Sequence, residues 1–304
     1  MLRKEEYFEP LRAEEKDSEF IAMESKSFFR DVMGRFAKNK RAMSALIVLV
    51  IIILIALIGP LVSSYTYDGM DSSAMNQSPS AKHLFGTDRM GRDLFTRVLY
   101  GARISLLVGI ATAVINSLVG IVYGGIAGYV GGAVDMWMMR LTDILYSIPE
   151  LLYIILIMLI FGSNIRSIII GICIAGWISM ARMVRSQIIT LKEQEFSLAA
   201  FVLGASSKRI LFKHLIINSL GSIIVTVTLM IPQAIFMEAY LSFVGVGISA
   251  PMASLGTLTQ DAKTYLEIYP YQMLFPVAVI CIIIFCLNFV GEGLNTALNP
   301  KGRR

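Results

Sequence analysis

Long apolar stretches alternate with short polar segments from residue 43 almost to the end of the chain. A helix that crosses the roughly 30 Å hydrocarbon core of a bilayer needs about 20 apolar residues. Six stretches reach or approach that length, which predicts an all-α, polytopic membrane protein with six transmembrane helices. The expected spans cover about residues 43–62, 104–130, 136–161, 167–187, 215–240 and 268–291.

Two of these spans are irregular. The third contains Pro149 and Glu150, which predicts a kink because proline removes a helix hydrogen bond. The fourth is uncharged only as far as Ala181. We therefore expect Arg182 and Arg185 to extend their charged ends toward the lipid headgroups.

The composition excludes a soluble globular protein. Hydrophobic residues make up 56% of the 304 residues and charged residues only 16%, which is too little polar surface for a fold of this size in water. The net charge of +5 is mild and gives no sign of a nucleic-acid partner. The three cysteines lie in apolar stretches without the spacing of a zinc site, so no metal is expected.

The distribution of lysine and arginine predicts the orientation. With the N-terminus inside, inner segments hold 16 of these residues and outer segments 6, which favours cytosolic N- and C-termini and a multi-pass protein of the cell membrane. The membrane domain then spans 43–300, between a cytosolic segment at 1–42 and a cytosolic tail at 301–304.

The N-terminal segment has two parts. Residues 1–25 mix acidic and basic side chains and are expected to be disordered. From about residue 27, apolar residues recur at helical spacing between basic ones, which predicts an amphipathic helix on the inner membrane surface. The alternative is a plain cytosolic extension of the first span.

Glycines recur every four residues in the second span, at Gly120, Gly124, Gly128 and Gly132. Such a stripe predicts a face on which another helix backbone approaches closely. The alternative is the general tolerance of glycine in membrane helices.

No catalytic motif is present, since the chain has no G-x-S-x-G, H-E-x-x-H or Walker-type sequence. We therefore expect no enzyme activity, no catalytic residue and no cofactor bound by this chain. Any energy supply must come from another protein.

The inner segment 191–213, between the fourth and fifth spans, is the most informative polar region. An apolar face at helical spacing is formed by Phe196, Ala199, Ala200 and Leu203. Gly204 follows as a left-handed cap, and Ser206 or Ser207 can cap the next helix. This pattern predicts a docking element, and the alternative is a hairpin that merely links two spans.

Several longer motifs stand in order along the chain. They are HLFGTDRMGRD at 83–93, YGARISLLVG at 100–109, GYVGG at 128–132, EFSLAAFVLGASSKRILFKHLIIN at 195–218, EAYLSFVGVG at 238–247 and NP at 299–300. Together they resemble the C-type permease subunit of the oligopeptide, dipeptide and nickel importers of the ATP-binding-cassette (ABC) class. The run at 195–218 is similar to the E-A-A-x-x-x-G loop of such permeases, and the resemblance covers about residues 27–300.

The resemblance implies the type I ABC importer permease fold. It also implies a heterodimer with a sister permease, two cytosolic ATPase subunits that carry ATP and Mg²⁺, and an extracellular or periplasmic binding protein that delivers the substrate, all at a lipid membrane. The residues it implies for ATPase docking, in a coupling loop at 191–213, are Glu195, Phe196, Ala199, Ala200, Leu203, Gly204, Ala205 and Ser206. Leu198 and Ile217 depart from the family's usual Glu and Pro, which removes a carboxylate from the loop.

Candidate contacts for an outer gate or for the binding protein lie at the other membrane face. They are Glu238, Asp88, Arg89, Arg92 and Asp93. Glu238 lies 24 residues after His214, about 36 Å along a helix, which places it near the outer membrane face. The alternative role for Glu238 is helix pairing, for instance with Arg103. Gly86 and Gly91 allow turns, so we expect the outer loop from Ser63 to about Tyr100 to be compact.

The function implied is import of peptides, coupled to ATP hydrolysis on the partner subunits. Nickel or another small solute is the alternative, although a nickel pathway would be expected to show more histidine, methionine or carboxylate. A second alternative, an ion-coupled secondary transporter, would be expected to contain inverted repeats and ionisable residues at mid-membrane. A membrane scaffold is the remaining alternative class.

Overall fold

The computed structural model describes residues 28–298, and every regular element in that range is a helix. The elements are α2 (Phe28–Lys38), α3 (Lys40–Val62), η3 (Ser72–Ala74), α4 (Leu94–Val130), α5 (Gly132–Tyr146), α6 (Glu150–Phe161), α7 (Ile165–Ala175), α8 (Trp177–Lys192), α9 (Glu195–Val202), α10 (Ser207–Arg209), η4 (Ile210–Leu215), α11 (Ile216–Val244), α12 (Leu255–Lys263) and α13 (Tyr271–Leu298). The expected disordered segment at 1–25, the tail at 301–304 and the NP motif lie outside the described residues.

Five helical segments of the described chain are long and apolar enough to cross a membrane. They are Lys40–Val62, Leu94–Val130, Ile165–Lys192, Ser207–Val244 and Tyr271–Leu298. A sixth crossing exists only if α5 and α6 are taken together, and these two helices are bent by 73° at the break between them. The six predicted spans are therefore present in part, because the third is a bent pair of half-length helices.

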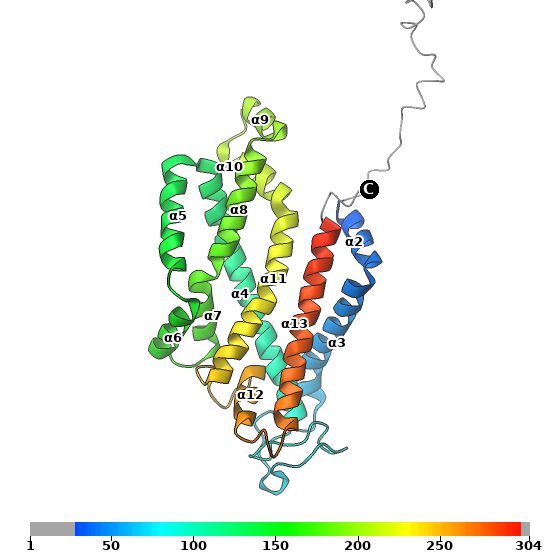
Figure 1. Cartoon of the computed structure of the whole chain (residues 1–304). Coiled ribbons are helices and arrows are strands. Elements are labelled where there is room, and N and C mark those ends of the chain that lie inside the picture. The colour runs from blue at the N-terminus through cyan, green and yellow to red at the C-terminus, as the bar shows by residue number, and fades with distance from the viewer. Residues whose placement is uncertain (1–27, 299–304) are drawn as a thin grey trace, which may run out of the picture.

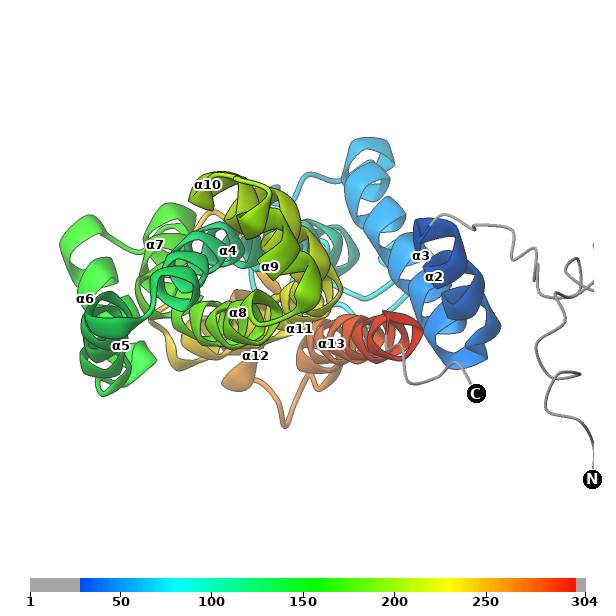
Figure 2. The ribbon, with the colours of Figure 1, turned by 90° about the horizontal axis from the view of Figure 1, so that it is seen from above.

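The helices form an elongated bundle with two different ends (Figure 1). The helix α9 and both ends of the described chain lie at one end, which we call the α9 end. The helix α12 and the loop 63–93 lie at the other, which we call the α12 end. Seen along the bundle, α4, α8 and α11 occupy the middle, α5 to α7 lie to one side, and α13, α3 and α2 lie to the other (Figure 2).

The helix α2 packs on the bundle through one face. Val32 and Phe36 are buried in a cluster that includes residues of α13 and α3, whereas Phe29 and Met33 are exposed. Part of the apolar stripe expected to lie on the membrane surface is thus used for packing within the protein.

The central helix α4 touches α8 almost backbone to backbone. A Cβ atom built on Gly124 would lie 2.1 Å from the carbonyl oxygen of Ala181, and one built on Gly120 or Gly128 would lie 2.6 or 2.8 Å from the nearest atom of α8. These three glycines therefore form the close-packing face that the sequence predicts. Gly132 does not belong to it, because α4 ends at Val130 and a Cβ on Gly132 would meet nothing within 4 Å.

Ion pairs join α8 to α5 near the α9 end. Arg182 donates to Asp143 over 2.9 Å, and Arg185 makes a two-pronged pair with Asp135. Each arginine that we expected to extend toward the lipid headgroups therefore has a carboxylate partner on the neighbouring helix.

Candidate functional site

The loop 63–93 at the α12 end is organised around Asp88, whose exposed fraction is 8%. One carboxylate oxygen of Asp88 accepts from Arg92 Nε at 2.6 Å and from Arg97 Nη1 at 3.1 Å. The other accepts the backbone N–H groups of Met90 and Arg92 at 2.8 and 3.0 Å. This single carboxylate therefore fixes the turn at 88–92 and ties it to the start of α4.

Two glycines and a second aspartate complete the compact loop. Gly91 has φ of +71°, and a Cβ there would lie 1.8 Å from the carbonyl oxygen of Asp71. Gly86 has φ of +77°, and a Cβ there would lie 2.5 Å from the carbonyl oxygen of Gln77. Asp93 caps α4 by accepting from the backbone N–H of Thr96 at 2.8 Å, and it also contacts His83 at 2.9 Å. The compact fold expected for this loop is present in the structure.

A cationic pocket of about 280 Å³ lies between this loop and α12. Arg89, Arg92 and Arg97 line it, and Asp261 of α12 faces Arg92 and Arg97 at 3.7 and 3.6 Å. Burial raises the pKa of the Asp261 carboxyl above its usual value, an effect that Arg92 and Arg89 partly offset. Arg97 Nε is buried without a hydrogen-bond partner. With Asp88 included, three arginines face two aspartates, so the pocket has a net positive charge.

Glu238 of α11 lies close to this pocket but has no exposed surface. Its carboxylate accepts from the hydroxyls of Ser105 on α4 at 2.7 Å and of Ser242 at 2.9 Å. Ser254, which caps α12, in turn contacts the Ser242 hydroxyl at 3.4 Å. Glu238 is therefore the polar joint at which α4, α11 and α12 meet.

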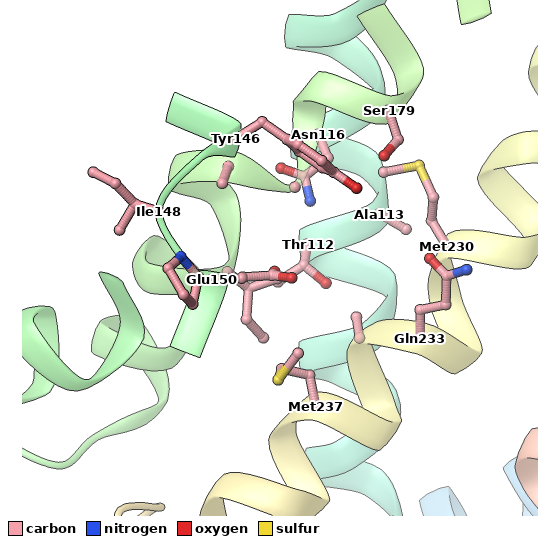
Figure 3. Close-up of a pocket in the computed structure, with 15 residues that line it drawn as sticks. Thr112, Ala113, Asn116, Tyr146, Ile148, Glu150, Ser179, Met230, Gln233 and Met237 are labelled. Atoms are coloured by element: carbon pink, nitrogen blue, oxygen red, sulfur yellow. The ribbon is translucent and has the colours of Figure 1, made fainter. Parts of the chain in front are cut away.

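A second pocket, of about 420 Å³, lies halfway along the bundle. Thr112 on its α4 wall is 18 residues from each end of that helix, and Met230 on its α11 wall is 14 residues from each end of α11. The break between α5 and α6 forms the facing wall (Figure 3). Non-helical backbone at this depth is tolerated where it lines a cavity or is buried in protein. We call this cavity the central pocket.

At the α9 end, α9 stands beyond the bundle and exposes large apolar side chains. Phe201, Val202 and Leu203 are 70%, 83% and 86% exposed, and Phe196 and Leu198 are exposed as well. Ser197 is buried, and Ala200 and Ala205 pack against the cluster formed by α8, η4 and α11. Ala200 therefore faces the bundle, whereas Ala199 is exposed on the outward surface together with the larger apolar residues.

The turn after α9 reverses the chain. Gly204 has φ of +80°, as its predicted role as a left-handed cap requires, and no atom lies within 4 Å of a Cβ built there. The side chain of Ser206 caps α10 by accepting from the backbone N–H of Arg209. A six-residue π-helical turn, η4, then leads without a gap into α11. Such turns are frequent at functional positions.

A family model described as "Binding-protein-dependent transport system inner membrane component" matches residues 120–304, more than half of the chain. The chain belongs to this family. A second model, the N-terminal TM domain of oligopeptide transport permease C, matches residues 27–79. Membership of this permease family confirms the resemblance drawn from the motifs and the expected multi-pass localisation in the cell membrane.

Relatives of this permease extend over nearly the whole chain. It is 47% identical to the oligopeptide transport system permease protein OppC of Bacillus subtilis, covering 98% of this chain and 97% of the relative. It is 42% identical to the dipeptide transport system permease protein DppC of the same organism, with coverage of 99% and 94%. The OppC protein of Escherichia coli K12 is 42% identical, with coverage of 95% and 96%.

Most of the outer candidates of the permease are packed within this chain. Asp88, Arg92 and Asp93 are buried and hold the loop together, so only Arg89 of the outer candidates is exposed. Glu238 is also buried, and its side-chain partners are Ser105 and Ser242, not Arg103.

Sequence reasoning missed other members of these sites. Arg97 and Asp261 complete the cationic pocket. They meet because α12 packs beside α4, and the sequence pattern does not indicate that contact. Thr112, Asn116 and Gln233 of the central pocket gave no signal. Glu150 did give one, as an acidic residue inside an apolar stretch, but it was used only to predict a kink.

Proposed function

We propose that this chain is one of two permease subunits of an ABC importer for peptides. The observation that carries the proposal is the identity of 42–47% over nearly the full length with relatives named as oligopeptide and dipeptide permeases. Within the complex, the chain and a sister permease enclose the substrate pathway. Two cytosolic ATPase subunits bind ATP and Mg²⁺, and this chain holds neither.

The exposed surface of α9 is the docking site for an ATPase subunit in this proposal. An apolar surface that large is costly in water and is typical of an interface. The α9 end is then cytosolic, with both chain termini on the same side, and the α12 end faces the binding protein. Arg89 and the cationic pocket are the permease surface nearest to that protein.

Reconstitution of the complete importer tests the function. Vesicles that contain this chain, its sister permease and the ATPase subunits should accumulate a radiolabelled peptide when ATP and the binding protein are supplied. Nickel ions, supplied in the same assay, are the control substrate. Uptake of nickel without uptake of any peptide would replace the proposed substrate, and uptake without ATPase subunits would refute the ABC mechanism.

Docking of α9 is tested with a substitution at its tip. Phe201→Glu places a charge on the exposed surface without touching the core of this chain. The variant should enter the membrane normally and lose most of its bound ATPase subunit in a pull-down. Thr190→Glu, a change at an exposed position 11 residues earlier, on α8, is the matched control. Equal recovery of the ATPase subunit with Phe201→Glu and with the control would refute docking through this surface.

A further inference from the structure

The central pocket contains one carboxylate that nothing in the described chain neutralises. Glu150 is the first residue of α6, directly after the break, and it is half-buried. No ion pair or hydrogen bond to its side chain is present among residues 28–298, and no lysine, arginine or histidine lines the pocket. A carboxylate near the middle of a membrane is costly without a partner, and such groups are typically functional.

Two polar residues of α4 face this carboxylate across the pocket. Thr112 and Asn116 are four residues apart, so they lie on the same side of α4, and Glu150 points toward them (Figure 3). The Thr112 hydroxyl donates its hydrogen to backbone carbonyls of its own helix, at 2.8 Å from Val108 O, so its oxygen is left as an acceptor. Asn116 is 3% exposed, and its Oδ1 is buried with no partner.

The three groups share one property. Each presents an oxygen that can accept a hydrogen bond, and one of them carries a negative charge. A primary ammonium group has one positive charge and three N–H donors, which matches that set. Charge-assisted hydrogen bonds of this type are about twice as strong as neutral ones. A metal ion fits less well, because no group of three or more His, Cys, Asp or Glu in the described chain could hold one.

We propose that the central pocket receives the α-ammonium group of a peptide in transit, with Glu150 as its counter-ion and Thr112 and Asn116 as neutral acceptors. This inference rests on the proposed function, from which it takes the peptide as substrate. The pocket volume of about 420 Å³ lies in the range of small-molecule sites. Gln233, on the α11 wall, can both donate to and accept from the peptide group that follows the ammonium.

The experiment compares a peptide that has the ammonium group with one that lacks it. The complete importer is reconstituted with tri-alanine or N-acetyl-tri-alanine, each supplied with the binding protein at a concentration well above its dissociation constant. Equal loading removes the binding protein's own preference from the comparison. The measured quantity is the ratio of the two uptake rates, for the wild type, for Glu150→Gln and for a control variant, Glu267→Gln. Glu267 is exposed in the loop after α12 and does not line the pocket.

Glu150→Gln should lower uptake of tri-alanine about tenfold and leave uptake of the acetylated peptide within about twofold, because only the former loses a charged partner. Glu267→Gln should leave the ratio unchanged. Asn116→Ala, which keeps the carboxylate, should shift the ratio in the same direction by a smaller factor. A Glu150→Gln complex that imports both peptides in the wild-type ratio refutes the inference and leaves the proposed function standing.

Two further results are also decisive. A wild-type complex that imports neither peptide refutes the proposed function and the inference with it. If Glu150→Gln instead releases the sister permease in size-exclusion chromatography while Asn116→Ala leaves the uptake ratio unchanged, the partner of the carboxylate is a cation of that subunit, and the inference is wrong.

Discussion

The substitution Asp88→Asn tests whether one buried carboxylate holds the loop 63–93 in place. The asparagine oxygen can still accept the two backbone N–H groups, but its NH₂ group then faces Arg92 and Arg97, which are also donors. Both arginines are at most 5% exposed, so their charges lose a partner that water does not replace. Breaking a buried ion pair from one side costs about 3–5 kcal/mol.

A cost of that size is measurable as a change in melting temperature. At about 2 °C or more per kcal/mol, the purified protein should melt at least ~6 °C lower than the wild type. The matched control is Asp261→Asn, which faces the same arginines at 3.6–3.7 Å from a side chain that is 38% exposed. It should cost about 1 kcal/mol or less, because ion pairs of this length from a partly exposed side chain are weak.

The assay is thermal unfolding of both variants in the same detergent, followed by limited proteolysis of the loop. Asp88→Asn should be cut within residues 63–93 at protease concentrations that leave Asp261→Asn intact. The reasoning would be wrong if Asp88→Asn melted within 1 °C of the wild type, or if Asp261→Asn were the more damaging change.

Three further predictions concern single positions. Gly124→Val should prevent α4 from packing on α8, because even a Cβ atom would lie 2.1 Å from the Ala181 carbonyl oxygen. Gly34→Ala is the control and should be neutral, because a Cβ atom there meets nothing within 4 Å. The two variants are compared by the yield of folded protein from membranes. Glu238→Leu should destabilise the protein by about 2–3 kcal/mol, because it leaves two buried hydroxyls without their acceptor. Glu238→Gln keeps one acceptor oxygen and should be less destabilising. Equal melting temperatures of the two variants would contradict this. Gly204→Val should raise the free energy of the turn by about 1 kcal/mol, because valine is strained at a φ of +80°. Peptide uptake should fall sharply while membrane insertion persists. Unchanged uptake with both ATPase subunits bound would refute coupling through this turn.

The apolar pattern predicted the helices well because burial in lipid acts on every residue of a span. It could not predict that the third span breaks into two helices at 73°, since a run of apolar residues around Pro149 is compatible with a kink or with a break. The glycine stripe failed at Gly132 for a related reason: the step of four continues in the sequence after the helix itself has ended at Val130.

Candidate sites were harder to predict because they depend on pairings between distant residues. Glu238 and its hydroxyl partner Ser105 are 133 positions apart, and no local pattern indicates that they touch. The motif residues Asp88 and Asp93 were expected to contact an outer gate or the binding protein, but a charged residue in a loop is equally compatible with an exposed contact and with a buried ion pair inside the loop. Ala200 was placed on the outer face of α9 by its spacing, whereas the packing of η4 turns it inward.

The contact between α4 and α8 has a mechanical consequence. Because the two backbones are this close at three successive glycines, sliding would bring side chains of one helix against the backbone of the other, so we expect the pair to move as one rigid rod. That rod joins α9 to the central pocket, because Ser179 in the pocket wall lies 13 residues before Lys192, about 20 Å along α8. We therefore expect a displacement of α9 to be passed along α8 to the pocket, and the α5–α6 break, where the helix is interrupted, to be the part of the pocket wall that yields.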